Sequence, residues 1–196
     1  MELEFGEREI HMENKVITEL DKFVFDFVNL LGIRYVIVSG YVAILFGRSR
    51  GTEDVDILIE PIAQSKFLEL YEKVEKEDFY FMNSTNPDTV YEMLVEGLAV
   101  RIAKRDMIIP NIELKFVKND IDRYSLDNRL RVVLGNNQVF ISPIEPQIAY
   151  KLYLGSDKDL EDAIYLWEIF KENINRSELH HFMKKMNVEG SEYGIG

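Results

Sequence analysis

Two aspartates, at positions 54 and 56, have the side-chain type and spacing best suited to chemistry in this chain. They belong to the run Asp54-Val55-Asp56-Ile57-Leu58-Ile59, whose apolar residues predict a β-strand. Residues two apart on a strand point to the same face, so these carboxylates repel each other unless a cation lies between them. Mg²⁺ prefers such oxygen ligands together with substrate phosphates. The pair therefore predicts a site for Mg²⁺ or Mn²⁺.

A tight turn precedes this strand in the sequence. The apolar run Ile33–Val38 predicts a buried strand, Ser39 and Gly40 form the turn, and Tyr41–Phe46 predicts a short helix. Backbone N–H groups and a serine hydroxyl at such a position can bind phosphate oxygens. The turn and the two aspartates together predict a site for a metal-bound phosphate compound.

Other polar residues have both a functional and an ordinary interpretation. Arg48 and Arg50 could neutralise phosphate charge or simply solvate the loop Gly47–Glu53. Lys151 could do the same, or could reach solvent from an apolar helix. Glu113 lies between Ile112 and Leu114, where a glutamate is either a third acidic site residue or a solvent-facing side chain of an edge strand.

The order of these elements resembles the nucleotidyltransferase superfamily, whose minimal fold is shared with DNA polymerase β. Val38-Ser39-Gly40 matches its turn, and Asp54-Val55-Asp56-Ile57 matches its carboxylate pair. Ile112-Glu113-Leu114 matches the strand that carries its third acidic residue. The lead-in Arg50-Gly51-Thr52-Glu53 before Asp54 is similar to that of small prokaryotic members related to AbiE-type toxins.

A later part of the chain resembles the same subfamily. It contains Pro146–Leu152, with Lys151 near its end, followed by Lys158–Asp162. On their own residue types, Asp159 and Asp162 are acids of a helix's first turn, which the helix dipole favours. Only the resemblance gives them a function.

The resemblance implies a role for each matched residue. Asp54, Asp56 and Glu113 would be catalytic and would ligate the metal. The nucleotide would be bound by Ser39, Gly40, Arg48, Arg50, Thr52, Lys151, Asp159 and Asp162, with Thr52 supporting the metal site. One departure is Ser39, where the family has glycine, because a Cβ restricts the turn and the approach of a triphosphate.

The remaining sequence predicts an α+β protein with a mixed β-sheet flanked by helices. Residues 1–142 alternate helical and strand patterns, and residues 143–196 predict three successive helices. We therefore expect a nucleotidyltransferase-like core, 1–142, and a C-terminal helical region, 143–196, that packs on it. Residues 1–10 are expected to be extended or frayed, a first helix is expected over 13–31, and 119–128 is ambiguous.

Composition limits the possible functions. The 196 residues include 46% hydrophobic ones, enough for a sizeable core, and carry a net charge of -12. That charge argues against broad, non-specific binding to nucleic acid. There is no cysteine, no apolar leader and no run suited to cross a membrane, so we expect a cytoplasmic protein.

Three functions of different classes follow from the sequence. The first is a Mg²⁺-dependent enzyme that transfers a nucleoside monophosphate from an NTP such as ATP to a hydroxyl of an RNA end, a protein or a small molecule. A toxin-like role, with an antitoxin partner or a homodimer, would be one form of it. The alternative is a nucleotide-binding or protein-interaction module without turnover. A structural subunit of a larger assembly is a third reading.

Overall fold

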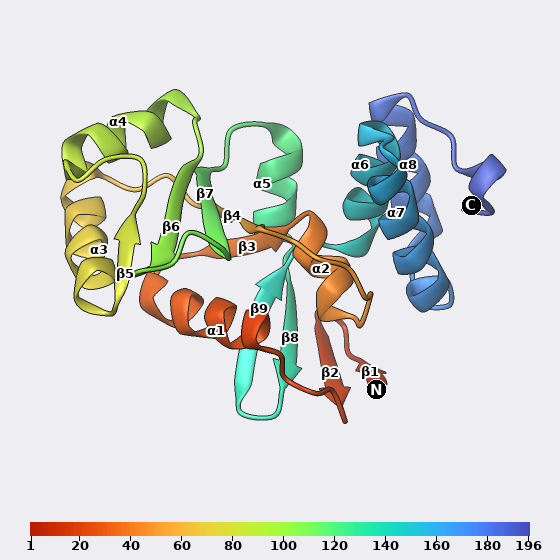
Figure 1. Ribbon diagram of the computed structural model, residues 1–196. Coiled ribbons are helices and arrows are strands. Elements are labelled where there is room, and N and C mark those ends of the chain that lie inside the picture. Colours follow the sequence, from red (N-terminus) through yellow and green to blue (C-terminus); the bar gives the residue numbers. More distant parts are fainter.

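The computed structural model describes all 196 residues and contains one mixed sheet of nine strands with eight α-helices (Figure 1). The strands are β1 (Glu2–Phe5), β2 (Glu9–Glu13), β3 (Tyr35–Val38), β4 (Asp54–Ile59), β5 (Phe79–Phe81), β6 (Val100–Lys104), β7 (Asn111–Phe116), β8 (Leu130–Leu134) and β9 (Asn137–Ile141). The helices are α1 (Glu19–Leu31), α2 (Gly40–Leu45), α3 (Gln64–Lys76), α4 (Pro87–Glu96), α5 (Asp120–Asp127), α6 (Ile144–Leu154), α7 (Asp157–Phe170) and α8 (Arg176–Met186). The predicted α+β class is confirmed.

The strand order β1-β2-β8-β9-β3-β4-β7-β6-β5 places β4 in the interior of the sheet, between β3 and β7. Strand β4 runs antiparallel to β3 and parallel to β7. In this register Asp56 lies opposite Val38 on one side and Glu113 on the other. The end of β3, which leads into the turn, and the acidic residues of β4 and β7 therefore lie side by side.

The two faces of the sheet differ because side chains alternate along each strand. On β4, Val55, Ile57 and Ile59 are fully buried in the main core, which also contains the aromatic residues of α1 and α3. Leu58 points to the other face and packs in a small cluster with Leu126 of α5. Figure 1 shows α1 and α5 on opposite sides of β3 and β4. Asp54 and Asp56 share the α5 face, which is less completely covered.

Helix α2 is anchored by a buried polar network. Helix α1 begins with a capping box between Thr18 and Asp21. Asp21 is fully buried, and its carboxylate accepts a hydrogen bond of 2.8 Å from the hydroxyl of Tyr41 on α2. Lys15 Nζ lies 2.5 Å from the other carboxylate oxygen. This network fixes the helix that follows the predicted phosphate-binding turn.

Helices α6, α7 and α8 form a compact group at one end of the sheet (Figure 1). Their buried residues, for example Ile148, Leu166 and Leu179, belong to the same continuous core as Ile37 of β3. Helix α7 also contacts α2. None of the eight helices combines the length and apolar character that crossing a bilayer would demand.

Three local expectations needed correction or completion. Residues 1–10 form β1 and the start of β2, and β2 pairs in parallel with β8. The first helix begins at Glu19, since Thr18 caps it, and not near residue 13. The ambiguous segment 119–128 contains α5, which is capped by Asn119 and Asp122.

Candidate active site on the open face of the sheet

The two aspartates that the sequence singled out lie on one face of β4, each partly buried. The hydroxyl of Thr52 donates to the backbone carbonyl of Asp54 at 2.9 Å and lies 3.4 Å from its Oδ1. Thr52 therefore fixes the entry to the strand and the side chain of Asp54.

Glu113 lies next to Asp56 across the strand pair, and basic side chains contact both oxygens of the Glu113 carboxylate. Lys115 Nζ is 3.2 Å from Asp56 Oδ1 and 3.2 Å from Glu113 Oε2. Arg101 donates through Nε and Nη2 to Glu113 Oε1 at 3.0 and 2.9 Å. The third acidic residue is thus brought beside the pair, but it is engaged by basic side chains.

These contacts give the two carboxylates different proton affinities. Burial raises the pKa of Asp56, although Lys115 opposes this effect. Burial alone would raise the pKa of Glu113, but Arg101 and Lys115 together lower it. Glu113 is therefore a weaker proton acceptor than an isolated glutamate. No three His, Asp or Glu side chains form a group that could hold a metal ion by themselves.

The turn between β3 and α2 is strained and is held by one side chain. Ser39 has φ 64° and ψ -140°, a region that favours glycine. The backbone N–H of Ser39 donates to Gln147 Oε1 at 3.2 Å, and Gln147 Nε2 donates to the Ser39 carbonyl at 2.7 Å. Gln147 is buried on α6 and also accepts from the hydroxyl of Ser142 at 3.0 Å. The C-terminal helical region therefore fixes the turn.

Gly40 is needed because an arginine packs on it. A Cβ at this position would lie 1.6 Å from Arg50 Nη2 and 2.9 Å from its Cζ. The guanidinium group therefore lies directly against the backbone of the turn. Its Nη1 atom is buried and has no hydrogen-bond partner.

Five of the predicted nucleotide-binding residues form a buried charge cluster between the loop after α2 and helices α6 and α7. Lys151 Nζ lies 2.6 Å from Asp159 Oδ1 and 3.0 Å from Asp162 Oδ2. Arg48 pairs with Asp162, and Arg50 Nε is 3.3 Å from Asp162 Oδ1. Burial alone would raise the pKa of Asp159, but Lys151 and Ser156 lower it. The cations of this cluster are therefore largely neutralised by carboxylates.

A cavity of about 310 Å³ opens on the acidic face. It lies between the sheet, α5 and α6, and the residues lining it include Ser39, Asp56, Lys115, Gln147, Tyr150 and Leu154. Tyr150 and Leu154 are 41% and 45% exposed, unusual for apolar groups on a helix that is otherwise mostly buried. Burial of the rest of its ring raises the pKa of Tyr150. The cavity thus joins the turn, one aspartate and an apolar wall.

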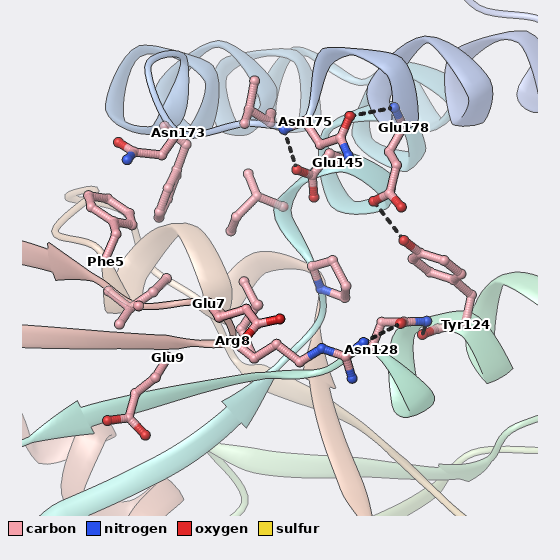
Figure 2. Close-up of a pocket in the computed structure, with 17 residues that line it drawn as sticks. Phe5, Glu7, Arg8, Glu9, Tyr124, Asn128, Glu145, Asn173, Asn175 and Glu178 are labelled. Atoms are coloured by element: carbon pink, nitrogen blue, oxygen red, sulfur yellow. Dashed lines mark hydrogen bonds between the residues drawn. The ribbon is translucent and has the colours of Figure 1, made fainter.

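A larger cavity of about 470 Å³ lies elsewhere, between the β1–β2 turn and helices α5, α6 and α8. Figure 2 shows Glu145 and Glu178 on one side of it and Arg8 on the other. Glu145 accepts the backbone N–H of Asn175 at 2.8 Å, and Tyr124 donates to Glu178 at 2.7 Å. None of the predicted site residues lines this cavity.

The predicted residues thus fall into two groups that meet at the Ser39–Gly40 turn. Asp54, Asp56, Glu113 and Thr52 belong to the acidic face, and Ser39 and Gly40 form the turn itself. The charge cluster contains the other five predicted residues, Arg48, Arg50, Lys151, Asp159 and Asp162. Sequence reasoning missed Gln147, Arg101 and Tyr150 and gave no role to Lys115. The only signal for Lys115 was its position two residues after Glu113, which places both on one strand face.

Comparisons with known proteins give results at the level of the fold. No profile of a known protein family matches the chain, and no curated protein matches it in sequence. The solution structure of the antibiotic-resistance factor ANT(2″)-Ia aligns with a TM-score of 0.57 at 11% identity, covering 91% of this chain and 95% of that one. The crystal structure of ANT(2″)-Ia in complex with adenylyl-2″-tobramycin gives a TM-score of 0.55 at 12% identity, covering 90% of this chain and 99% of that one.

A third similar structure is an antigenic nucleotidyltransferase-like protein from Paracoccidioides brasiliensis. It aligns with a TM-score of 0.54 at 18% identity, covering 84% of this chain and 86% of that one. Such low identities establish the architecture and not the activity. The chain has the nucleotidyltransferase-like fold.

Proposed function

We propose that the protein transfers a nucleoside monophosphate from an NTP to a hydroxyl group of an acceptor. The observation that carries this proposal is the position of Asp54 and Asp56 on one open face of β4, beside a cavity that also reaches the Ser39–Gly40 turn. The nucleotidyltransferase-like fold of the chain supports the proposal.

The donor set fits a Mg²⁺ or Mn²⁺ ion held by Asp54 and Asp56. Both are hard oxygen ligands, both are partly exposed, and Asp54 is oriented by Thr52. Mg²⁺ commonly uses one or two protein carboxylates and takes its other ligands from water and phosphate. When bound, the ion would supply charge that stabilises the phosphate oxygens during transfer. Glu113 completes the acidic face.

The protein's own groups would bind and orient the nucleotide. Gln147 occupies the backbone N–H of Ser39, and the Ser39 side chain caps no N–H of α2, so the hydroxyl is the group that Ser39 would offer to the triphosphate. Arg50 lies against Gly40 with its Nε and Nη1 atoms buried and without hydrogen-bond partners, so its guanidinium group is the cluster's candidate donor to a phosphate oxygen. Asp162 contacts Arg50, and Arg48 and Lys151 in turn pair with Asp162.

In the proposed reaction the acceptor oxygen attacks the α-phosphorus in line with the leaving group. A new phosphorus–oxygen bond forms, the bond to the bridging oxygen breaks, and pyrophosphate leaves while the hydroxyl proton is released. The chain's contribution is to hold the triphosphate at the turn and the acceptor at the open cavity, so that both reactants are aligned.

The acceptor is proposed to be an RNA end, a protein or a small molecule. The net charge of -12 makes a large RNA the least favoured of the three. A small molecule is the acceptor class that the fold supports best, because ANT(2″)-Ia, with a similar fold, has a structure in complex with adenylyl-2″-tobramycin. A toxin-like role with an antitoxin partner or a homodimer remains the form suggested by the resemblance to AbiE-type relatives.

The test is transfer of label from each of the four NTPs, with Mg²⁺ or Mn²⁺, to total RNA, total protein and a panel of aminoglycosides. We expect label from the α-phosphate, but not from the γ-phosphate, to reach one acceptor class. Asp56→Asn should reduce transfer by at least a hundredfold, because it removes a ligand of the ion. Asp106→Asn, on an exposed turn, is the matched control and should transfer normally.

The second candidate is a nucleotide-binding or protein-interaction module without turnover. The engagement of Glu113 by Lys115 and Arg101 favours it, since a third free carboxylate is then missing. Nucleotide binding without label transfer to any acceptor class, with either metal, would establish this alternative and reject the enzyme.

A further inference from the structure

The carboxylates of the acidic face repel one another, and basic side chains of the protein offset part of this repulsion. Asp56 and Glu113 lie opposite each other on neighbouring parallel strands, and Asp54 lies two residues from Asp56. Three carboxylates on one partly buried face repel one another strongly. Cationic groups must therefore lie among them if the strands are to pair in this register.

Lys115 supplies one of these cations in a bridging position. Its ammonium group is equidistant, at 3.2 Å, from one oxygen of Asp56 and one oxygen of Glu113. The side chain is one-third exposed and extends along the same strand face as Glu113. The space that an ion shared by these two carboxylates would need is thus filled by a covalently attached charge.

Arg101 completes the neutralisation of Glu113. It forms two hydrogen bonds to Glu113 Oε1, whereas Lys115 contacts Oε2. Both oxygens of this carboxylate are therefore used by basic side chains. Asp54, by contrast, contacts only the hydroxyl of Thr52, and Asp56 Oδ2 has no protein partner.

We propose that Lys115 is a built-in second cation, so that the site binds one divalent ion, on Asp54 and Asp56, and not two. The inference rests on the proposed nucleotidyl transfer. Enzymes that use two ions in phosphoryl chemistry hold them about 3.5–4 Å apart, one for the attacking and one for the leaving oxygen. In this protein the ammonium group takes the position of one of them, and Glu113 orients that group rather than ligating metal.

The experiment counts Mn²⁺ ions by electron paramagnetic resonance, with α,β-methylene analogues of the four NTPs bound to the full chain. Wild type should show one Mn²⁺ per chain with an uncoupled spectrum. Lys115→Met should bind a second Mn²⁺ and show the spin-coupled spectrum of a close pair. Lys118→Met is the matched control, since this exposed lysine lines the same cavity but contacts only the backbone carbonyl of Glu96, and it should resemble wild type.

The outcomes separate this inference from the proposed function. A coupled pair in wild type overturns the role of Lys115 and leaves nucleotidyl transfer standing. A single Mn²⁺ in Lys115→Met also overturns the role of Lys115, because removing the lysine then does not allow a second ion to bind. Failure of every analogue to bind overturns both proposals.

Thermal unfolding gives a second measurement that does not depend on the nucleotide. In chelator, Lys115→Met should melt several degrees below wild type, because Asp56 and Glu113 lose their shared cation. Mn²⁺ should raise the melting temperature of this variant more than that of wild type or Lys118→Met. Equal shifts in all three proteins would contradict the inference.

Discussion

At the scale of single residues, the Ser39–Gly40 turn shows how a strained conformation is maintained. Ser39 adopts a backbone conformation that costs a residue with a Cβ about 1–3 kcal/mol. Gln147 bonds both backbone polar groups of Ser39, and Ser142 bonds Gln147 in turn. Ser39 is thus held at the edge of the cavity on the acidic face.

Replacing Ser39 by glycine should show how much the strained backbone of the turn costs in stability. Glycine relieves the strain but costs about 0.5–1 kcal/mol in unfolded-chain entropy, so we expect Ser39→Gly to stabilise the fold by about 1 kcal/mol. Urea unfolding measures this change. Asn187→Gly is the control, since Asn187 has an ordinary left-handed conformation that asparagine tolerates, and its stability should change little. If Ser39→Gly is less stable than wild type, contacts of the serine side chain contribute more to the free energy of unfolding than relief of the backbone strain.

At the scale of secondary-structure elements, strand β4 shows what the sequence could predict. Its sequence predicted the strand and placed Asp54 and Asp56 on one face, and Leu58 on that same face packs beside Leu126 of α5. The hairpin β8–β9 and the three C-terminal helices were also predicted, since each depends on local periodicity or turn residues. Asn119 and Asp122 were a capping signal for α5, but the segment that follows is too short for its periodicity to distinguish a helix from a loop.

The rest could not be predicted because it depends on pairing between distant segments. The parallel pairing of β2 with β8 joins residues more than a hundred positions apart, and only the folded sheet brings Arg101 opposite Glu113. The same holds for Gln147, whose role requires α6 to pack beside the turn. Alternation gives the face of a residue, but register decides its partner.

The contact between α2 and the following loop leads to a prediction at this scale. Gly40→Ala would place a Cβ 1.6 Å from Arg50 Nη2. Arg50 is buried and contacts Asp162, so its displacement should cost about 1–3 kcal/mol in unfolding free energy. Gly51→Ala is the matched control, because its Cβ would have no neighbour within 4 Å. Equal stability of the two variants would show that Arg50 rearranges freely and that the packing is not specific.

At the scale of the whole molecule, charges join the sheet-containing part to the C-terminal helices. Arg48 and Arg50 come from the loop after α2, whereas Lys151, Asp159 and Asp162 come from α6 and α7. Asp162 is fully buried and contacts three basic side chains, so it is the centre of this junction. A buried ion pair adds little net stability, but removing one member leaves its partners without compensation.

Asp162→Asn should therefore destabilise the protein by about 3–5 kcal/mol, because it leaves Arg48, Arg50 and Lys151 buried with too little negative charge. The control is Asp157→Asn, an exposed aspartate in the first turn of the same helix, which should cost less than about 1 kcal/mol. Urea unfolding followed by circular dichroism measures both changes. We also expect Asp162→Asn to be cleaved faster by protease in the loop after α2, since the cluster no longer holds that loop against α7. If Asp162→Asn is as stable as Asp157→Asn, the apolar core alone holds the helical region and the charge cluster adds nothing to stability.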